Sequence, residues 1–331
     1  MSNQGSASER SDLLSGFDLD AIGAAILDAI PGFGDPRPLR KLGDGFHSVV
    51  VETSDEIVFR LSRSPASMLL HRRERELLNR IAGFVSVSMP DPRWVIHPRP
   101  GIPFGAVGYP KVAGNPLNPA QLGHSKSLAS DIAGFLLELH GIEPLAVGLS
   151  ARDVENAGRP IVRELHRSVA AVLRQEFGGQ AVERIKRWLD SVLADEKLLQ
   201  PTPRLRHGDF WYGNLLIDPA SGALAAVLDF ENAGIGDPAL DFATLRYIGD
   251  DFARTVLDLY VASGGAVDDN FAHRIQRHWE LREFDGLSHV VLNDLSDELP
   301  DQLRKLRDGP VMSTQPRFQD VEPHSISRGS A

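Results

Sequence analysis

Three polar residues near the middle of the chain have the types and spacing that phosphoryl transfer requires. Asp209 follows His207 and Gly208, Asn214 lies five residues after Asp209, and Asp229 comes behind an apolar run. Phosphoryl transfer needs a carboxylate near the attacking hydroxyl. It also needs an amide oxygen and a second carboxylate to hold Mg²⁺ against the nucleotide phosphates. All three groups are present in that order, which predicts a kinase-type site.

Each of these residues has its own expected role. Asp209 orients the acceptor hydroxyl and takes its proton late, for which an ionised carboxylate suffices. Asn214 turns back across the loop to offer its amide oxygen to Mg²⁺, and Asp229 supplies the harder ligand. Leu215–Ile217 and Leu224–Leu228 are predicted to form a hairpin. Such a hairpin would bring Asn214 and Asp229 together at one end.

Three further residues around this segment are predicted to support it. His207 is expected to brace the loop through hydrogen bonds, although contact with the substrate is the alternative. Asp237 and Asp241 are expected to cap the next helix and tie it to the loop. We therefore expect all three to support the loop and its metal ligands, and not to bind the metal themselves.

A glycine-containing hairpin is predicted upstream. Residues 42–53 have the pattern of strand, glycine turn and strand, and 57–61 form a third short strand. Gly43 and Gly45 would let backbone N–H groups approach phosphate oxygens, with Ser48 as an added donor. The alternative is a plain hairpin turn, because a single Gly-x-Gly is common.

The third strand carries Arg60, and the basic helix that follows, about 68–81, carries Glu74. The apolar face of that helix is predicted to consist of Leu69, Leu77, Leu78 and Ile81. A kinase-type site needs a cation on this strand that reaches the phosphates and is oriented by a helix carboxylate. Arginine would act there as a planar fork, unlike the point charge of a lysine. The alternative for Glu74 is a surface i, i+4 partner of an arginine.

Residues 85–110 are rich in Pro and Gly and suit edge strands that complete a small antiparallel sheet. The next segment is predicted to connect two lobes. A nucleotide base bound between lobes would touch backbone groups there, which makes Tyr109, Lys111 and Val112 candidate nucleotide-binding residues. From residue 125 onward the pattern is mainly helical.

The composition excludes several classes of function. With 331 residues the chain is long enough for two domains, and no apolar run approaches the roughly 18 residues of a membrane span. Zero cysteines exclude disulfides and thiolate metal sites. The net charge of −10 argues against nucleic-acid binding and mildly favours a cationic small molecule. The polar N-terminus shows no secretory signal, so a cytoplasmic protein without nucleic-acid or membrane partners is expected.

These motifs together resemble the aminoglycoside phosphotransferase family of kinase-like enzymes. The resemblance is carried by 207–214, by Leu228-Asp229-Phe230 and by 236–242. It extends over roughly residues 35–300. Segments in the same order as in that family are Gly43–Ser48, Phe59-Arg60, Arg73-Glu74 and Gly108–Gly114. Within the family the chain looks most like the aminoglycoside 2″-phosphotransferases, with macrolide phosphotransferases next.

The resemblance implies an α+β, bilobal protein-kinase-like fold that uses ATP or GTP with Mg²⁺. We expect an N-terminal nucleotide-binding lobe over 17–112 and a mostly helical C-terminal lobe over 113–308. Loose segments at 1–16 and 309–331 would flank them. Carried over by position, Asp209 is the catalytic base and Asn214 and Asp229 are the metal ligands. Arg60 and Glu74 stand at the phosphate-binding pair.

Two positions depart from the kinase pattern. Arg60 replaces the more familiar lysine, which changes how the phosphates are contacted. Glu231 follows Asp229-Phe230 where protein kinases have glycine, and no activation-segment signature comes after it. These departures argue against a protein kinase and for a small-molecule acceptor.

The acceptor of this family binds between the catalytic loop and the C-terminal helices. Those segments offer Glu280, Glu283, Asp285, Trp211 and Tyr212. Carboxylates suit a polycationic aminoglycoside, but they are also typical of a solvated helix face. The favoured hypothesis is an aminoglycoside phosphotransferase acting as a monomer or homodimer. The alternatives are a macrolide phosphotransferase, a sugar or amino-alcohol kinase, and a catalytically silent nucleotide-binding protein.

Overall fold

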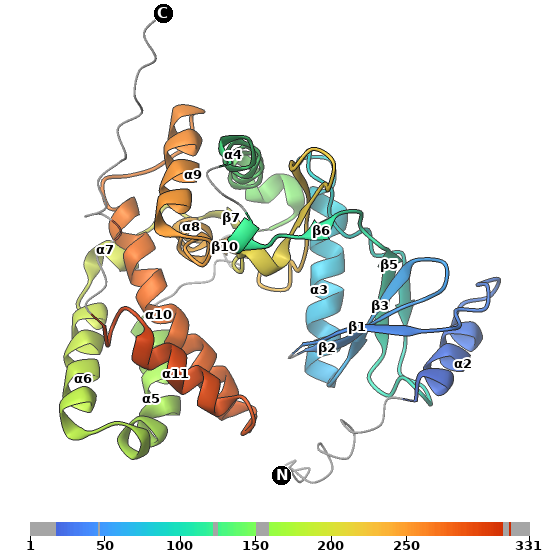
Figure 1. Cartoon of the computed structure of the whole chain (residues 1–331), viewed down its shortest axis with the longest axis horizontal. Coiled ribbons are helices and arrows are strands. Elements are labelled where there is room, and N and C mark those ends of the chain that lie inside the picture. The colour runs from blue at the N-terminus through green and yellow to red at the C-terminus, as the bar shows by residue number, and fades with distance from the viewer. Residues whose placement is uncertain (1–17, 46, 122–124, 150–158, 314–317, 319–331) are drawn as a thin grey trace, which may run out of the picture. The chain divides into compact units, whose positions relative to one another are not determined.

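The computed structural model describes residues 18–45, 47–121, 125–149, 159–313 and 318 (Figure 1). The N-terminal segment 1–16, predicted to be loose, lies outside these residues. The chain forms two compact units. Unit 1 comprises Met1–Gly114 and Ala225–Glu231, and unit 2 comprises Asn115–Leu224 and Asn232–Ala331. Unit 1 carries an antiparallel sheet and unit 2 is mostly helical, which confirms the predicted α+β fold class.

The sheet of unit 1 has five antiparallel strands in the order β1-β2-β3-β5-β4. The strands are β1 (Arg40–Asp44), β2 (Ser48–Glu52), β3 (Ile57–Ser62), β4 (Trp94–Ile96) and β5 (Ala106–Pro110). In a strand successive side chains point to opposite faces, so β3 presents Phe59 and Leu61 to one side and Arg60 and Ser62 to the other. Both sets are buried.

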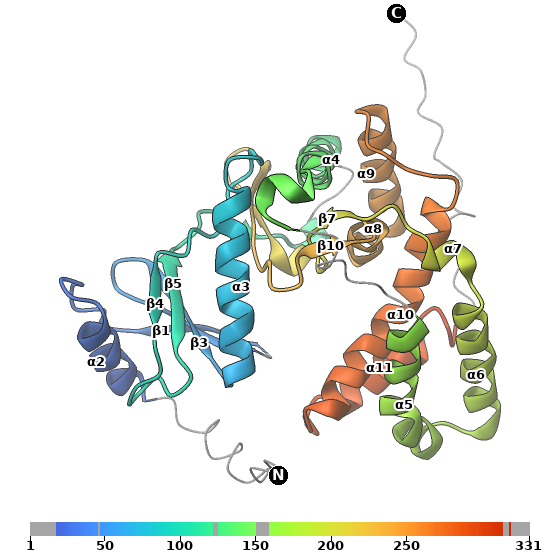
Figure 2. The same cartoon turned by 180° about the vertical axis from the view of Figure 1, so that it is seen from behind.

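The face with Phe59 is covered by helix α2 (Leu19–Ala29). Asp18 caps this helix by accepting hydrogen bonds from the backbone N–H groups of its first turn. Ile22 and Ile26, one turn apart, are buried against the sheet. In Figures 1 and 2, α2 and α3 lie on opposite sides of the sheet.

Helix α3 (Pro65–Ile81) covers the face with Arg60. Ser64 caps it, and Pro65 suits the first turn because its missing N–H would have no partner there. The sequence predicts Leu69 on the apolar stripe of this helix, but that side chain is 66% exposed. The buried face instead carries His71 and Glu74 among its apolar residues. Polar contacts with Arg60 therefore set the rotation of the helix.

The segment 225–231 belongs to unit 1, although the sequence prediction placed it in the C-terminal lobe. β9 (Leu224–Val227) begins in unit 2, after the turn that follows β8 (Leu215–Ile217). Val227 N–H then donates to Ser88 O at 3.0 Å, and Phe230 N–H donates to Glu74 Oε1 at 2.8 Å. These hydrogen bonds attach the Asp229 segment to the body of unit 1.

Unit 2 is built mainly of helices. Two short strand pairs accompany them: β6 (Asn115–Pro116) pairs with β8, and β7 (Arg204–Arg206) with β10 (Gly234–Gly236). One of its hydrophobic clusters joins α5, α6, α7, α10 and α11. The helices are α4 (Lys126–Gly141), α5 (Arg159–Glu176), α6 (Gly179–Leu193), α7 (Glu196–Leu199), α8 (Ala239–Leu245), α9 (Asp250–Ala262), α10 (Phe271–Leu292) and α11 (Leu299–Asp308).

Two residues of the tail predicted to be loose are packed. Val311 joins the cluster of α10 and α11, and Phe318 is fully buried. The guanidinium of Arg254 lies 4.4 Å from the centre of the Phe318 ring, and Phe318 N–H donates to Gln276 Oε1 at 3.0 Å. The prediction of a loose tail from residue 309 is therefore wrong for these two residues. The other residues beyond Ser313 lie outside the described part of the chain.

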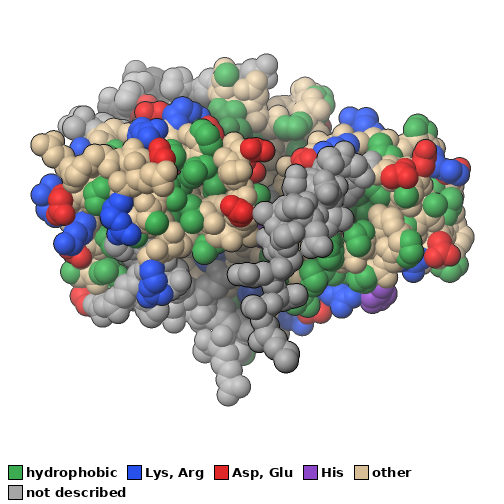
Figure 3. All heavy atoms as spheres, turned by 90° about the horizontal axis from the view of Figure 1, so that it is seen from below, with side chains coloured by type: hydrophobic (Ala, Val, Ile, Leu, Met, Phe, Trp, Pro, Cys, Tyr) green, Lys and Arg blue, Asp and Glu red, His purple; other side chains and the backbone are tan. Residues whose placement is uncertain are grey.

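No described helix is both long enough and apolar enough to span a bilayer. On the face shown in Figure 3, Lys and Arg side chains are interspersed with Asp and Glu side chains.

Candidate active site

The loop that carries Asp209 depends on a glycine. Gly208 has φ +84°, and a Cβ at this position would lie 2.2 Å from Asn232 O. No residue with a side chain fits there without movement. The sharp turn leads from the buried strand β7 to Asp209, whose side chain is 16% exposed.

Both oxygens of Asp209 have a partner in unit 2. Arg282 Nη2, on α10, lies 2.5 Å from Asp209 Oδ1. Asn214 Nδ2 donates to Asp209 O at 2.9 Å and to Oδ2 at 3.3 Å. Because the Asn214 nitrogen is used in this way, its amide oxygen points elsewhere and can serve a cation.

Asp241, at the start of α8, holds the same loop in place through hydrogen bonds. Its carboxylate accepts hydrogen bonds from His207 N–H at 2.9 Å and Gly208 N–H at 2.8 Å. His140 Nε2 lies 3.1 Å from it. Burial alone would raise the pKa of Asp241, but these hydrogen bonds, led by His140, hold that pKa below its usual value. The buried His207 imidazole in turn lies 3.3 Å from Asp209 N–H.

Asp237 ties α8 to α10. Its Oδ1 accepts from Ala239 N–H at 3.1 Å in the first turn of α8. Its Oδ2 lies 2.9 Å from Arg274 Nε and 2.8 Å from His278 Nε2. These contacts lower the pKa of Asp237 despite its burial, so the carboxylate is ionised and has no free position for a metal.

In unit 1, Asp229 is a candidate metal ligand through its carboxylate. Its backbone is left-handed, with φ +61°, a conformation that non-glycine residues adopt at a cost and mostly at functional sites. Its Oδ1 is buried and receives no hydrogen bond from any described residue. Arg60 Nη2 lies 3.5 Å from this oxygen. A buried carboxylate oxygen of this kind fits a divalent cation.

The Arg60 guanidinium is almost fully buried and lies among three carboxylates. Its Nη1 lies 2.7 Å from Glu74 Oε2, and its Nη2 contacts Glu231 in addition to Asp229. Burial raises the pKa of Glu74 to about 7. Burial has the same tendency at Glu231, but the contact with His71 Nε2 and the charge of Arg60 hold the pKa of Glu231 below its usual value.

Few of the described side chains in either unit are arranged as metal ligands. No group of three His, Asp or Glu side chains suited to a metal occurs within the described ranges. Mg²⁺ is commonly held in proteins by one or two carboxylates, with waters and substrate phosphates completing its octahedron. One amide and one carboxylate, Asn214 and Asp229, fit that mode. Since they fall in different units, their convergence stays a prediction.

The other predicted nucleotide-binding residues lie in unit 1. In the sheet register Ser62 faces Ser48 and Val58 faces Tyr109, so Ser48 and Tyr109 share the face that carries Arg60. Gly43 lies in β1 and Gly45 in the following turn, where Gly45 N–H donates to Ser48 O at 2.9 Å. The hydroxyl-bearing Ser48 is buried.

Lys111 and Val112 follow the end of β5. The Lys111 ammonium lies 2.7 Å from Glu52 Oε1, and Lys111 N–H donates to Glu56 O at 2.8 Å. Val112 is partly exposed. The Lys111 side chain is therefore directed at the sheet, which leaves backbone groups of this segment as the candidates for base contact.

Two of the three predicted acceptor carboxylates are already engaged in unit 2. Glu280 accepts from Trp188 Nε1 at 2.8 Å and from Arg277 Nη1 at 2.8 Å. Glu283 is buried and accepts from Tyr247 Oη at 3.1 Å. Both carboxylates thus have partners within the protein, and their pairing with an acceptor amine stays a prediction. Asp285, in contrast, is exposed.

The predicted aromatic acceptor residues lie close to the catalytic loop. Trp211 and Tyr212 are partly exposed, with ring centres 4.8 Å apart. The Trp211 ring also lies 6.3 Å from Tyr247, whose own ring is 4.8 Å from Trp279. These rings pack in one run beside the loop that carries Asp209, and their contact with an acceptor stays a prediction.

Three site residues were missed by the sequence analysis. Arg282 contacts Asp209, and His71 and Glu231 contact each other beside Arg60. For His71 a signal was available, because it lies three residues before Glu74 and hence on the same helix face. Arg282 lies 73 residues from Asp209 in a helix rich in arginine, so spacing could not identify it.

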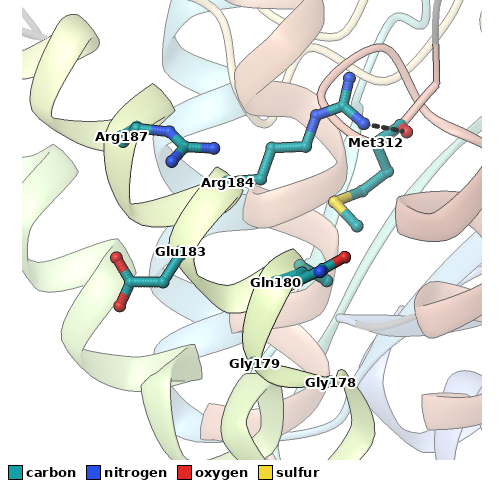
Figure 4. Close-up of a pocket in the computed structure, with 8 residues that line it drawn as sticks. Gly178, Gly179, Gln180, Glu183, Arg184, Arg187 and Met312 are labelled. Carbon is teal, nitrogen blue, oxygen red and sulfur yellow. Dashed lines mark hydrogen bonds between the residues drawn. The ribbon is translucent and has the colours of Figure 1, made fainter.

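A hollow of the described surface lies away from these residues. It has a volume of about 1110 Å³ and is lined by the start of α6 and by Met312. In Figure 4 the Arg184 side chain reaches across it to Met312 O, at 3.0 Å. None of the predicted site residues lines this hollow, so it is not the candidate active site.

Comparisons with known proteins match most of the length of the chain. A family model described as "Phosphotransferase enzyme family" matches residues 38–306. A comparison with curated protein sequences gives no match. Among solved structures, an aminoglycoside 2″-phosphotransferase IIIa in complex with GDP and kanamycin is similar, with a TM-score of 0.75 and 22% identity. That match covers 86% of this chain and 96% of the other.

Two further structures show the same fold. The gentamicin complex of aminoglycoside 2″-phosphotransferase IIa has a TM-score of 0.67 at 20% identity, with 94% of this chain and 99% of the other covered. Macrolide 2′-phosphotransferase MphH from Brachybacterium faecium has a TM-score of 0.60 at 21% identity, with 90% and 98% covered. The predicted kinase-like fold is thereby confirmed. Because the family model spans most of its length, the chain belongs to the phosphotransferase enzyme family.

Proposed function

We propose that this phosphotransferase moves the γ-phosphate of ATP or GTP to a hydroxyl of a small molecule, with Mg²⁺ as cofactor. The observation that carries the proposal is the contact between Asp209 and Asn214 in one loop. It combines a carboxylate that can accept the hydroxyl proton with an amide whose oxygen is directed away from that carboxylate. Asn214 and Asp229 would hold Mg²⁺, which would neutralise charge on the phosphates.

The chain's own residues then divide the work between donor and acceptor. Arg60 binds the phosphates as a planar fork and is oriented by Glu74. Asp209 accepts a hydrogen bond from the acceptor hydroxyl, aligns its oxygen with the phosphorus, and receives the proton late in the reaction. Gly43 and Gly45 leave room for backbone N–H groups to approach the phosphates.

The first acceptor class that we propose is the aminoglycosides, because two similar structures are complexes with kanamycin and gentamicin. The second is the macrolides. The engaged carboxylates Glu280 and Glu283 favour this second class, because an apolar macrolide needs fewer anionic partners than a polycation does. The aromatic rings of Trp211 and Tyr247 suit such an apolar acceptor.

Phosphate transfer tests the proposal directly. The purified protein is incubated with Mg²⁺ and ATP or GTP and with a panel of kanamycin, gentamicin, a macrolide, sugars and amino alcohols, and the phosphorylated product is measured. Asp209→Ala should lower the rate by about 10²–10⁴-fold, which is the usual contribution of a general base. Asp190→Ala, an exposed carboxylate on α6, is the matched control and should leave the rate unchanged.

Full activity in Asp209→Ala would contradict the catalytic assignment. Calorimetric nucleotide binding without transfer to any acceptor of the panel would instead favour a catalytically silent nucleotide-binding protein. Inhibition of a drug-sensitive bacterium that expresses the protein, measured across aminoglycosides and macrolides, separates the acceptor classes. Unchanged inhibition by every drug would indicate a metabolite kinase.

A further inference from the structure

We propose that Glu231 is a positioning residue for the nucleotide phosphates, which acts by holding the Arg60 guanidinium in a fixed orientation and away from Asp229. The inference rests on the proposed function, because it takes Arg60 to contact the nucleotide. All the residues involved belong to unit 1.

The first step concerns the shape of the cation. Arg60 Nη1 lies 2.7 Å from Glu74, and Nη2 contacts Glu231. A guanidinium is a flat fork, so one carboxylate on each terminal nitrogen defines the plane of the whole group. A lysine ammonium is a point charge and would need only the Glu74 contact. Arginine at position 60 therefore creates the need for a second carboxylate, and Glu231 meets it.

The second step concerns how Glu231 itself is held. His71 Nε2 lies 3.0 Å from Glu231 Oε1, and His71 Nδ1 lies 2.8 Å from Ser62 Oγ. Ser62 follows Arg60 by two residues on β3 and so points to the same face. His71, Ser62 and the Glu231 side chain are all buried. The contacts thus close into a ring that starts and ends on β3, which leaves the Glu231 carboxylate little freedom.

The third step concerns Asp229. Arg60 Nη2 lies 3.5 Å from Asp229 Oδ1, beyond a good hydrogen bond, while the same nitrogen contacts Glu231. If Glu231 lost its charge, the guanidinium would turn toward Asp229 and pair with it. Asp229 would then be paired with the Arg60 guanidinium and would no longer be available to Mg²⁺. Glu231 therefore keeps the predicted metal ligand available.

A double-mutant cycle on the full-length protein tests this role. The dissociation constants of MgADP and MgGDP are measured by calorimetry for wild type, Arg60→Lys, Glu231→Gln and the double variant. Each single variant should bind roughly tenfold more weakly, the size expected for the loss of a charged hydrogen bond. The double variant should bind no more weakly than the weaker single, because both substitutions remove the same contact.

A magnesium titration adds a second measurement, whose result would not change if Glu231 had only a structural role. For Glu231→Gln, half-maximal nucleotide binding should require a higher Mg²⁺ concentration than for wild type, because Arg60 then competes for Asp229. An unchanged Mg²⁺ requirement would contradict the third step.

Asp195→Asn is the matched control. The Asp195 side chain is 7% exposed, against 6% for Glu231, and it likewise bridges a histidine and an arginine, His273 and Arg277, both at 2.7 Å. This carboxylate lies in unit 2, outside the candidate site. Its substitution should lower the thermal midpoint to an extent similar to Glu231→Gln, but it should leave nucleotide affinity unchanged.

The outcomes separate this inference from the proposed function. Wild-type protein that binds neither nucleotide would overturn both. Nucleotide binding that is unaffected in Glu231→Gln, or losses that add in the double variant, would overturn the inference alone. If Glu231→Gln does not fold, His71→Asn, which removes the contacts of His71 with Glu231 and Ser62 but keeps the Glu231 carboxylate, should show the same weakened binding and raised Mg²⁺ requirement. Unchanged binding in that variant would also overturn the inference.

Discussion

The candidate site residues of unit 1 and those of unit 2 carry their charges differently. In unit 1 a single buried arginine, Arg60, is shared by three carboxylates. Burial lowers the pKa of the neighbouring His71, so this histidine adds no positive charge at pH 7. The carboxylates outnumber the cation, and the cluster keeps a negative excess even when Glu74, with its pKa of about 7, is protonated. In unit 2 the Asp209 carboxylate is matched by one cation, Arg282.

This difference corresponds to two kinds of ligand. A divalent cation neutralises an excess of negative charge, so the cluster of unit 1 suits a magnesium–nucleotide complex. A balanced pair attracts neither sign strongly and suits a neutral hydroxyl that must lose a proton. The protein therefore concentrates charge where the donor is expected to bind and balances charge where the acceptor is expected.

The largest effect within the unit 1 cluster is expected for Glu74→Gln. The variant loses the charged contact with Arg60, although its side-chain oxygen can still accept from Phe230 N–H. Arg60 is then held from one end only. We expect nucleotide affinity to fall by more than tenfold, toward the upper end for charged hydrogen bonds. Calorimetry with MgADP and MgGDP measures this change.

Glu74→Gln should lower nucleotide affinity, but it should not lower the thermal stability of the fold at alkaline pH. Burial raises the folded-state pKa of Glu74 to about 7, whereas the unfolded value is about 4.3. A raised pKa means that its stabilising contribution is complete below the unfolded value and is lost as pH rises through the folded value. The neutral variant lacks this loss, so at pH 8 its thermal midpoint should equal or exceed that of wild type. A marked fall at pH 8 would show that the ion pair stabilises the fold.

The sequence predicted the parts of the site that are fixed by local spacing. Asp209, Asn214 and Asp229 stand in one segment of about twenty residues, and Arg60 and Glu74 fall on consecutive elements whose periods are visible in the sequence. Contacts between elements were not predictable in this way. The pairing of Arg282 with Asp209 depends on how α10 packs, and the engagement of Glu280 by Trp188 depends on how α6 packs against α10.

The errors have a related physical cause. Leu69 was assigned to the buried face of α3 on the basis of hydrophobic periodicity, yet it is exposed. The buried face of α3 instead carries His71 and Glu74, because the buried Arg60 on the sheet requires polar partners. Periodicity in apolar residues fails where the buried contact is ionic.

A smaller effect is expected in unit 2 from Arg282→Gln. The substitution removes the cation next to Asp209 and leaves Asn214 as the neighbour of that carboxylate. If Arg282 holds the base in place, kcat should fall by about tenfold, as for one charged hydrogen bond, while the nucleotide KM stays unchanged. An unchanged or higher kcat would show instead that the acceptor displaces Arg282. Arg304→Gln, an exposed arginine of α11, is the control.

The smallest effect is expected for Asp285→Asn, which tests the acceptor class. Asp285 is exposed, so its substitution should change the free energy of unfolding by about 0.5 kcal/mol or less. An amine of an aminoglycoside paired with this carboxylate would lose a solvent-exposed ion pair, worth about 0.2–1 kcal/mol, so the KM for kanamycin should rise only a few-fold. The KM for a macrolide should not change. Equal KM values for wild type and variant with both drugs would show that Asp285 does not pair with an amine of the acceptor. Glu280 and Glu283 already have partners within the protein, so none of the three predicted carboxylates would then be assigned to the amines.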